Sequence, residues 1–289
     1  MDMGKTIGIF DSGVGGLSVL HHIRQALPDA NLIYVADSAH VPYGDKPPEY
    51  ITARSFALTR FLVEQGAEAI VIACNTATAA AAASLRKQFF LPIVAMEPAV
   101  KPAVAVTKSG VVGVLATIGT LESARFAALL EKYAGDVEIV TQGCPGLVEL
   151  VERGELRSPE ARRLIERYTA PLLVRGADTL ILGCTHYPFL APLIREVVGD
   201  QIALVDTGAA VARELKRRVE TELVGWGELV GWVERSDTHH PASDGYRYAP
   251  PILPKETFYT SGDPEQATRI MSVLWGSEVS VQQLPKEFL

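Results

Sequence analysis

Short apolar runs rich in β-branched residues alternate with amphipathic stretches along almost the whole chain. Thr6 to Phe10, Asn31 to Ala36 and Ala69 to Ala73 are strand-like, and each is followed by a turn and a helix-like stretch. This alternation is typical of parallel sheets, because the chain must cross back over the sheet before it can add the next parallel strand. The sequence therefore predicts an α/β fold with mostly parallel central sheets.

The same alternation starts again at Val111. Three landmarks recur in the same order and with similar spacing, since Gly8, Cys74 and Val94 have counterparts at Gly113, Cys184 and Val205. Such a match indicates an internal duplication, with a period too long for a solenoid repeat. We therefore expect two similar flavodoxin-like domains, related by pseudo-two-fold symmetry, with the active site in the cleft between them.

The domain boundaries follow from this duplication. A chain of 289 residues exceeds the usual size of one domain. We predict a first domain of residues 1–97 plus 208–289 and a second domain of residues 98–207. Within the first, residues 222–254 contain a short repeated segment and a polar, Pro-rich exit, which predicts an inserted loop. The adjacent His239 and His240 in this loop are not predicted to bind metal, because neighbouring residues rarely ligate one ion.

Composition and charge exclude several classes of protein. The net charge of −7 argues against the broad basic face that nucleic acids or anionic membranes require. The basic run Lys216 to Arg218 is interpreted as a solvated helix face. No apolar run is long enough for a transmembrane helix, and no signal peptide is predicted at the N-terminus. The three cysteines are far apart and odd in number, which favours reduced thiols in the cytoplasm.

Two of these cysteines stand at the ends of predicted strands. Cys74 follows Ala69 to Ala73, and Cys184 follows Thr179 to Leu182. Ligands of open α/β sheets bind beyond the carboxyl ends of the strands, and a helix N-terminus there lowers the pKa of a thiol. A single free cysteine is commonly a small buried hydrophobe. The pairing favours a functional role for both, whereas Cys144 lacks such a pairing and is predicted to be structural.

Four further side chains are candidates beside the thiols. Asp11 and Ser12 open a Gly-rich turn that does not match the dinucleotide-binding pattern; it either binds an anion or holds a helix N-cap. His186 lies two residues after Cys184 and is a candidate acid or base, with a core or capping histidine as the alternative. Glu152 is a further candidate, with a solvated helix face as the alternative.

Five segments together resemble the glutamate racemases of the aspartate/glutamate racemase family. They are Asp11 to Gly16, Pro42 to Gly44, Ala73 to Ala77, Gly183 to Pro188 and Phe258 to Asp263. The resemblance extends from about Thr6 to Trp275 apart from the inserted loop. It implies a racemase that acts on glutamate without a cofactor or a metal and supplies D-glutamate for peptidoglycan. It leaves a homodimer open as the assembly.

The resemblance also implies the residues of the site. Its catalytic residues would be Cys74 and Cys184, assisted by Asp11, His186 and Glu152. Its substrate-binding residues would be Asp11, Ser12, Pro42, Tyr43, Gly44, Asn75, Thr76, Thr117, Thr185 and His186.

Racemisation at an α-carbon requires a base on one face and an acid on the other. Two thiols on opposite sides of a cleft meet this requirement and exchange roles with the direction of reaction. No lysine motif for pyridoxal is visible, so hydrogen-bond donors must stabilise the carbanion. Two alternatives remain open at this point: a racemase of the same superfamily acting on aspartate, and a catalytically silent protein that binds amino acids or a partner.

Overall fold

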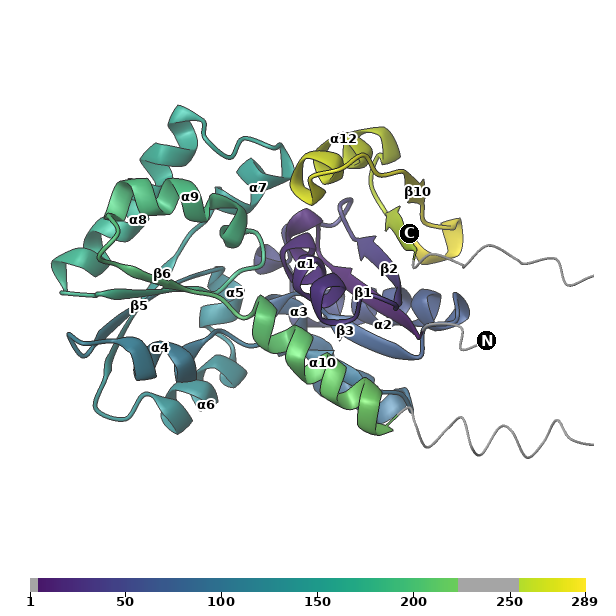
Figure 1. The fold of residues 1–289 in the computed structure, drawn as a ribbon, viewed down its shortest axis with the longest axis horizontal. Coiled ribbons are helices and arrows are strands. Elements are labelled where there is room, and N and C mark those ends of the chain that lie inside the picture. Colours follow the sequence, from purple (N-terminus) through teal and green to yellow (C-terminus); the bar gives the residue numbers. More distant parts are fainter. Residues whose placement is uncertain (1–4, 223–254) are drawn as a thin grey trace, which may run out of the picture.

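The computed structural model describes residues 5–222 and 255–289. Two parallel sheets stand next to each other, each covered by helices (Figure 1). The predicted inserted loop, with its paired histidines, lies outside the described residues apart from Glu222.

The first sheet has six strands and contains both ends of the described chain. Its strand order is β10-β9-β2-β1-β3-β4, and all neighbours are parallel. The strands are β1 (Thr6–Asp11), β2 (Asn31–Ala36), β3 (Ala69–Ile72), β4 (Ile93–Ala95), β9 (Glu256–Thr260) and β10 (Val281–Gln283).

The second sheet has four parallel strands in the order β6-β5-β7-β8. They are β5 (Val111–Ala116), β6 (Glu138–Gly143), β7 (Thr179–Leu182) and β8 (Ala203–Val205). The four strands repeat the order β2-β1-β3-β4 of the first sheet. Gly8 pairs with Ile70 in one sheet and Gly113 with Leu180 in the other, which gives Cys74 and Cys184 equivalent positions. The predicted α/β fold with two parallel sheets is confirmed.

Helices fill the connections between the strands. In the first part of the chain they are α1 (Leu17–Ala26), α2 (Pro48–Glu64) and α3 (Asn75–Gln88), with 3-10 turns η1 (Val14–Gly16) and η2 (Tyr43–Asp45). Around the second sheet they are α4 (Val100–Val106), α5 (Ile118–Leu121), α6 (Ala124–Tyr133), α7 (Leu147–Glu152), α8 (Pro159–Val174) and α9 (Tyr187–Val198). The last are α10 (Gly208–Glu222), α12 (Pro264–Trp275) and the 3-10 turn η3 (Lys286–Phe288).

The chain passes between the two sheets after β4 and again after β8. In the second passage α10 packs against α1 and β4, so it covers the first sheet. The domain boundaries at 97/98 and 207/208 fall in these two passages and stay a prediction.

The structure contradicts one of the two interpretations of the Gly-rich turn after β1, namely that it holds a helix N-cap. The N-cap of α1 is Gly16, with no side-chain cap, so an N-cap at Asp11 or Ser12 is wrong. The reason is that Val14 to Gly16 form a 3-10 turn, which separates Asp11 from the helix. The Asp11 carboxylate instead reaches across the turn and accepts the Gly16 N–H at 2.6 Å.

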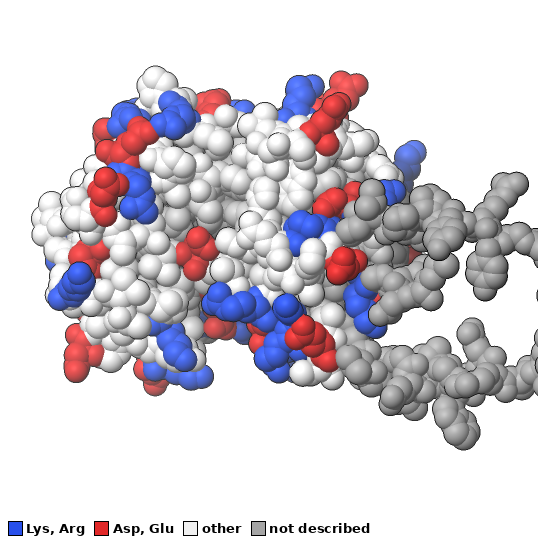
Figure 2. Space-filling model, in the orientation of Figure 1, with Lys and Arg blue, Asp and Glu red and all other residues white. Residues whose placement is uncertain are grey.

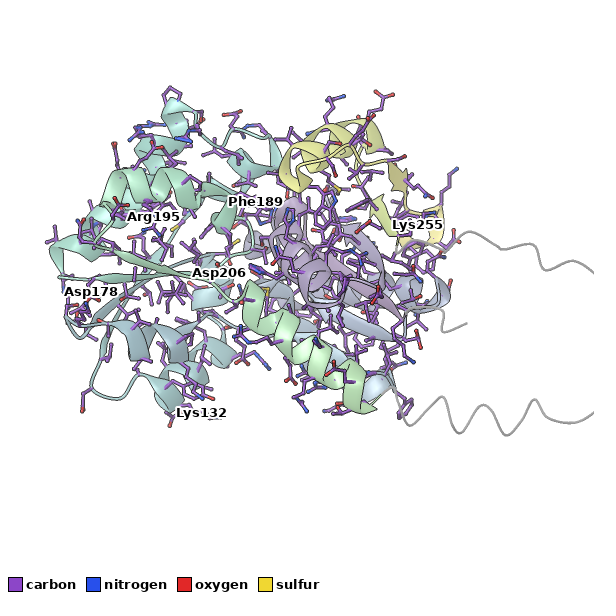
Figure 3. All side chains as sticks on the ribbon, viewed as in Figure 1. Lys132, Asp178, Phe189, Arg195, Asp206 and Lys255 are labelled. Carbon is purple, nitrogen blue, oxygen red and sulfur yellow. The ribbon has the colours of Figure 1, made fainter. Side chains whose placement is uncertain are left out.

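The amino ends of the strands point outward. Asp178, directly before β7, and Lys255, directly before β9, lie at opposite ends of the molecule (Figure 3). Because all strands are parallel within their sheets, the carboxyl ends of the two sheets face one another across the middle.

Charged side chains are mixed over the surface. Lys and Arg are interspersed with Asp and Glu on the face that Figure 2 shows. In the basic run of α10, Arg217 and Arg218 both pair with Glu214 of the same helix, which supports the solvated-face interpretation. Among the described helices none is long and apolar enough to cross a bilayer.

Candidate active site

A small pocket lies where the carboxyl ends of the two sheets meet. About 290 Å³ of space, part of it open to solvent, is free of protein atoms here. Its lining is Ser12, Pro42, Tyr43, Gly44, Cys74, Asn75, Thr76, Thr117, Thr120, Val148, Gly183, Cys184, Thr185 and His186. Most predicted site residues are therefore brought together, whereas Asp11 and Glu152 stand behind the lining and touch it through hydrogen bonds.

Three lining residues were missed by the sequence analysis. Thr120 lies one helical turn after Thr117 in α5, a spacing that could have indicated it. Gly183 directly precedes Cys184, and only its backbone contributes. Val148 belongs to α7, and nothing in its apolar surroundings in the sequence marks it.

Cys74 lies between β3 and α3 and is the N-cap residue of α3. Its Sγ accepts the Ala77 N–H at 3.4 Å and lies 3.9 Å from the Ser12 hydroxyl, to which the thiol donates. Burial raises the pKa of the Cys74 thiol well above its ordinary value, and the negative charge of Asp11 raises it further. The raised pKa favours the neutral thiol form of Cys74.

Asp11 is completely buried at the end of β1. Its carboxylate accepts the N–H groups of Ser12 and Gly16 at 2.7 and 2.6 Å, and the Thr185 hydroxyl at 3.1 Å. Burial raises the pKa of the carboxyl, while the charge of His186 and the Ser12 N–H oppose this effect. Asp11 thus links Ser12 of the first sheet, to which Cys74 donates, to Thr185 of the second.

Cys184 belongs to a chain of three side chains. Its Sγ lies 3.6 Å from Nδ1 of His186, and Nε2 of His186 lies 2.7 Å from Oε1 of Glu152. Burial alone lowers the pKa of His186, but hydrogen bonds to Cys184 and Glu152 outweigh it and raise the pKa well above the ordinary value. The raised pKa favours the protonated form of His186.

The capping alternative for His186 and the solvated-face alternative for Glu152 are wrong. The His186 side chain makes no capping hydrogen bond to α9, although the residue holds the N-cap position. The Glu152 side chain is only 13% exposed and is not solvated. It also accepts the Val14 N–H at 2.7 Å, so it connects the second sheet's α7 to the turn after β1.

The glycines of this turn permit that contact. A Cβ at Gly13 would lie 1.9 Å from Oε1 of Glu152, and one at Gly15 would lie 2.3 Å from Nδ1 of His186. Real Cβ atoms essentially never approach so closely. The Gly-rich turn is thus needed for the approach of Glu152 and His186 to the first sheet.

Polar side chains from both sheets close the rest of the pocket. The Asn75 amide donates to the Gly183 carbonyl at 2.9 Å, and its own Oδ1 is buried without a partner among the described residues. The hydroxyls of Thr76, Thr117 and Thr120 form a cluster with separations of 3.0 to 3.2 Å. Hydroxyl and amide groups are therefore available to a small polar ligand.

The third cysteine has a different environment. Cys144 directly follows β6, but its thiol donates to the Gln142 carbonyl at 3.3 Å and does not line the pocket. Burial raises its pKa to about 12. No cluster of three His, Cys, Asp or Glu side chains suited to a metal ion occurs in residues 5–222 and 255–289.

Comparisons with known proteins agree with this geometry. The sequence model of the Asp/Glu/Hydantoin racemase family matches residues 7–215. The glutamate racemase of Stutzerimonas stutzeri is 50% identical over 98% of this chain and 99% of its own length. That of Pseudomonas aeruginosa PAO1 is 53% identical over 96% and 97%.

Solved structures show the same fold. The glutamate racemase RacE1 of Bacillus anthracis superposes with a TM-score of 0.81 at 28% identity, covering 99% of both chains. The Escherichia coli enzyme, solved with L-glutamate and the activator UDP-MurNAc-ala, gives 0.77 at 30% identity, covering 97% of this chain and 98% of its own. With its matched sequence and its fold, this chain belongs to the Asp/Glu/hydantoin racemase family.

Proposed function

We propose that this protein is a glutamate racemase, an isomerase that interconverts L- and D-glutamate by acid/base catalysis with two cysteines. One observation carries the proposal: Cys74 and Cys184 occupy equivalent positions in two facing sheets and line the same pocket. The high identity to curated glutamate racemases supports the substrate.

In the proposed mechanism Cys74 removes the α-proton of D-glutamate and Cys184 donates a proton to the opposite face. L-Glutamate reacts in reverse. The assignment of each thiol to an enantiomer follows the family resemblance. Before the α-proton is removed, the Cys74 thiol gives its own proton to the Asp11 carboxylate, with which it forms a hydrogen bond. The ammonium group of the substrate favours the resulting thiolate by placing a positive charge nearby, which offsets the cost of its burial. On the other side, protonated His186 is placed to return a proton to Cys184.

The carbanion needs stabilisation that this chain's own groups can supply. Ser12 and Thr76 offer hydroxyl donors and Asn75 offers an amide around the pocket. Thr185, whose hydroxyl donates to Asp11, lines the same pocket. Donors fixed before the reaction stabilise developing charge without reorganisation. The small volume of the pocket keeps bulk water from the carbanion. We assign substrate binding to these residues together with Asp11, Pro42, Tyr43, Gly44, Thr117 and His186.

The biological role follows the family resemblance. We propose that the enzyme acts in the cytoplasm and supplies D-glutamate for peptidoglycan, and we retain a homodimer as the proposed assembly. Depletion of the protein in its own bacterium should stop growth, and D-glutamate in the medium should restore it. Light scattering of the purified protein tests the dimer.

Removal of each cysteine tests the mechanism. Cys74→Ala and Cys184→Ala should each abolish racemisation of both enantiomers, as measured by circular dichroism. In each variant, exchange of the α-proton of one enantiomer should survive. Cys144→Ala is the matched control and should retain activity, because Cys144 does not line the pocket. Near-normal turnover in either single variant would sink the two-cysteine mechanism.

The same assay separates glutamate from aspartate. One methylene changes binding by only about 1 to 3 kcal/mol, so L-glutamate, D-glutamate and L-aspartate must be compared directly. We expect turnover of both glutamate enantiomers. Faster turnover of aspartate would make the enzyme an aspartate racemase. Turnover of neither amino acid would favour a binding protein.

A further inference from the structure

A buried ion pair stands directly behind the pocket and has no role in the mechanism above. Asp37, which follows β2, is completely buried, and Arg54 of α2 is 8% exposed. Two hydrogen bonds join them, from Nη2 to Oδ1 at 2.7 Å and from Nε to Oδ2 at 3.0 Å. This two-point geometry is specific to arginine, because a lysine ammonium cannot reproduce the fork. Neither residue lines the pocket.

The pair is connected to the pocket through Tyr43. The Tyr43 hydroxyl donates to Oδ2 of Asp37 at 2.6 Å, and the Tyr43 side chain is buried. The hydroxyl is therefore already used by Asp37, and the residue contributes to the pocket as part of the short turn η2. The Asp37 carboxylate accepts hydrogen bonds from both Tyr43 and Arg54. The position of the Tyr43 side chain therefore depends on that of the Arg54 guanidinium.

Arg54 is itself fixed on its far side. Its Nη2 also donates to the Phe288 carbonyl at 2.9 Å. The Phe288 ring packs against Phe61 of α2, with 5.3 Å between ring centroids. The guanidinium thus joins the Asp37 carboxylate to η3 and has little freedom to move.

The turn η2 is tightly fitted on the opposite side as well. A Cβ at Gly44 would lie 2.9 Å from Cβ of Thr117, and a Cβ at Gly119 would lie 3.0 Å from the Gly44 carbonyl oxygen. The backbone of the turn therefore touches α5 of the second sheet, and a shift of a few tenths of an ångström would change the closure of the pocket. A two-point anchor on one side and a close contact on the other define one position for the turn.

We propose that Arg54 is a positioning residue for the reaction: through Asp37 it fixes the Tyr43 side chain and thereby the place at which Tyr43 and Gly44 close the pocket. The consequence for catalysis rests on the proposed function. An ion pair that only joined α2 to the sheet would affect stability without a specific effect on substrate affinity, and the two roles therefore give different results.

The conservative variant Arg54→Lys keeps the charge and loses the fork. We expect KM for both enantiomers to rise about tenfold, the effect of losing roughly one charge-assisted hydrogen bond, with a smaller change in kcat. The matched control is Arg24→Lys. Arg24 pairs with Glu256 at 2.6 Å and donates to three backbone carbonyls at the amino end of the same sheet. Its replacement should leave KM unchanged, and an equal rise in KM there would overturn the proposal.

A double-mutant cycle with Tyr43→Phe tests the connection. If Arg54 acts through Asp37 on the Tyr43 hydroxyl, Arg54→Lys should change KM little once that hydroxyl is absent. If the two substitutions instead raised KM independently, so that the factor in the double variant were the product of the two single factors, the proposed connection through Asp37 would be contradicted.

Hydrogen exchange gives a readout that does not need activity. In Arg54→Lys, backbone amides of the peptide that covers residues 42–45 should exchange faster than in the unaltered protein and in Arg24→Lys. Unchanged exchange would overturn the positioning role. An unaltered protein without racemase activity would refute the proposed function, while the exchange rates would still decide the role of Arg54.

Discussion

A single oxygen atom of Glu152 joins the two halves of the site. Oε1 accepts the Val14 N–H from the turn after β1 and lies 2.7 Å from Nε2 of His186. The contact holds only while the turn carries no side chain at Gly13. The chemistry proposed for Cys184 therefore depends on Gly13, which takes no part in the reaction.

Substitution of Gly13 tests this dependence. The new Cβ in Gly13→Ala would displace the Glu152 carboxylate and thereby remove one of the hydrogen bonds that raise the pKa of His186. We expect kcat/KM to fall about a hundredfold, the usual effect of an ångström-scale displacement in an active site. In the control Gly66→Ala the glycine has φ of 85° and no neighbour to clash with. It should cost about 1 to 2 kcal/mol of stability with kcat/KM unchanged. An unaltered rate in Gly13→Ala would contradict the role of the turn.

The pH dependence with D-glutamate reports on Cys74. Burial and then the charge of Asp11 raise the pKa of its thiol. A raised pKa keeps the thiol protonated to higher pH, so the rising limb of kcat/KM should lie above the ordinary thiol value of about 8.5. Asp11→Asn removes the negative charge, which lowers the thiol pKa and moves the limb to lower pH, whatever its effect on the maximal rate. A limb at the same pH in both enzymes would refute this electrostatic coupling.

The two thiols were recognised from the sequence because they stand near strand ends. Cys74 and Cys184 were predicted because each follows a short apolar strand and each has a counterpart in the other half. Asp37 and Arg54 were not predicted, because their pairing arises only when α2 packs against the sheet. A carboxylate in a turn and an arginine within a helix are ordinary surface residues by sequence alone.

At the level of elements the strands were predicted more closely than the short helices. The strand predicted for Ala69 to Ala73 ends one residue earlier, at Ile72. The short helix α5, capped by the Thr117 side chain, was not predicted. A helix of four residues has no periodicity to detect, and packing against η2 holds it.

Helix α3 depends on Cys74 for its N-cap, which separates stability from catalysis. Serine is a good N-cap and alanine is a poor one. Cys74→Ser should therefore be more stable than Cys74→Ala by about 1 kcal/mol in urea unfolding, although both lose racemase activity. Ser158 caps α8 in the same way, remote from the pocket, so Ser158→Ala should lose a similar amount of stability and retain activity. Equal stability of the two Cys74 variants would show that the thiol does not act as a cap.

In the whole molecule the duplication positions the two sheets, and a few hydrogen bonds set the distance between them. The common strand order was predictable from landmarks in the sequence. The contacts across the middle were not predictable, because they join residues far apart in the chain. Asn75 donates to the Gly183 carbonyl, Thr185 to Asp11, and Ser18 to the Thr185 carbonyl.

Ser18 allows a test of closure outside the pocket, because it belongs to α1 and does not line the site. Its hydroxyl lies 2.8 Å from the Thr185 carbonyl oxygen and 2.9 Å from that of Gly15. Ser18→Ala removes one connection between the sheets, and a net loss of about 1 kcal/mol corresponds to about a fivefold rise in KM for both enantiomers. The change in kcat should be smaller, since no group at the reacting carbon is lost.

A control variant separates closure from stability in that experiment. The buried Thr169 hydroxyl donates to the Ile165 carbonyl at 2.8 Å. Thr169→Val therefore removes a hydrogen bond that lies within α8 and does not connect the two sheets. Its unfolding free energy should fall by a similar amount while KM stays constant. An unchanged KM in Ser18→Ala, or the same rise in Thr169→Val, would mean that the sheets keep their distance without this hydrogen bond. Closure would then depend on the contacts within the pocket alone.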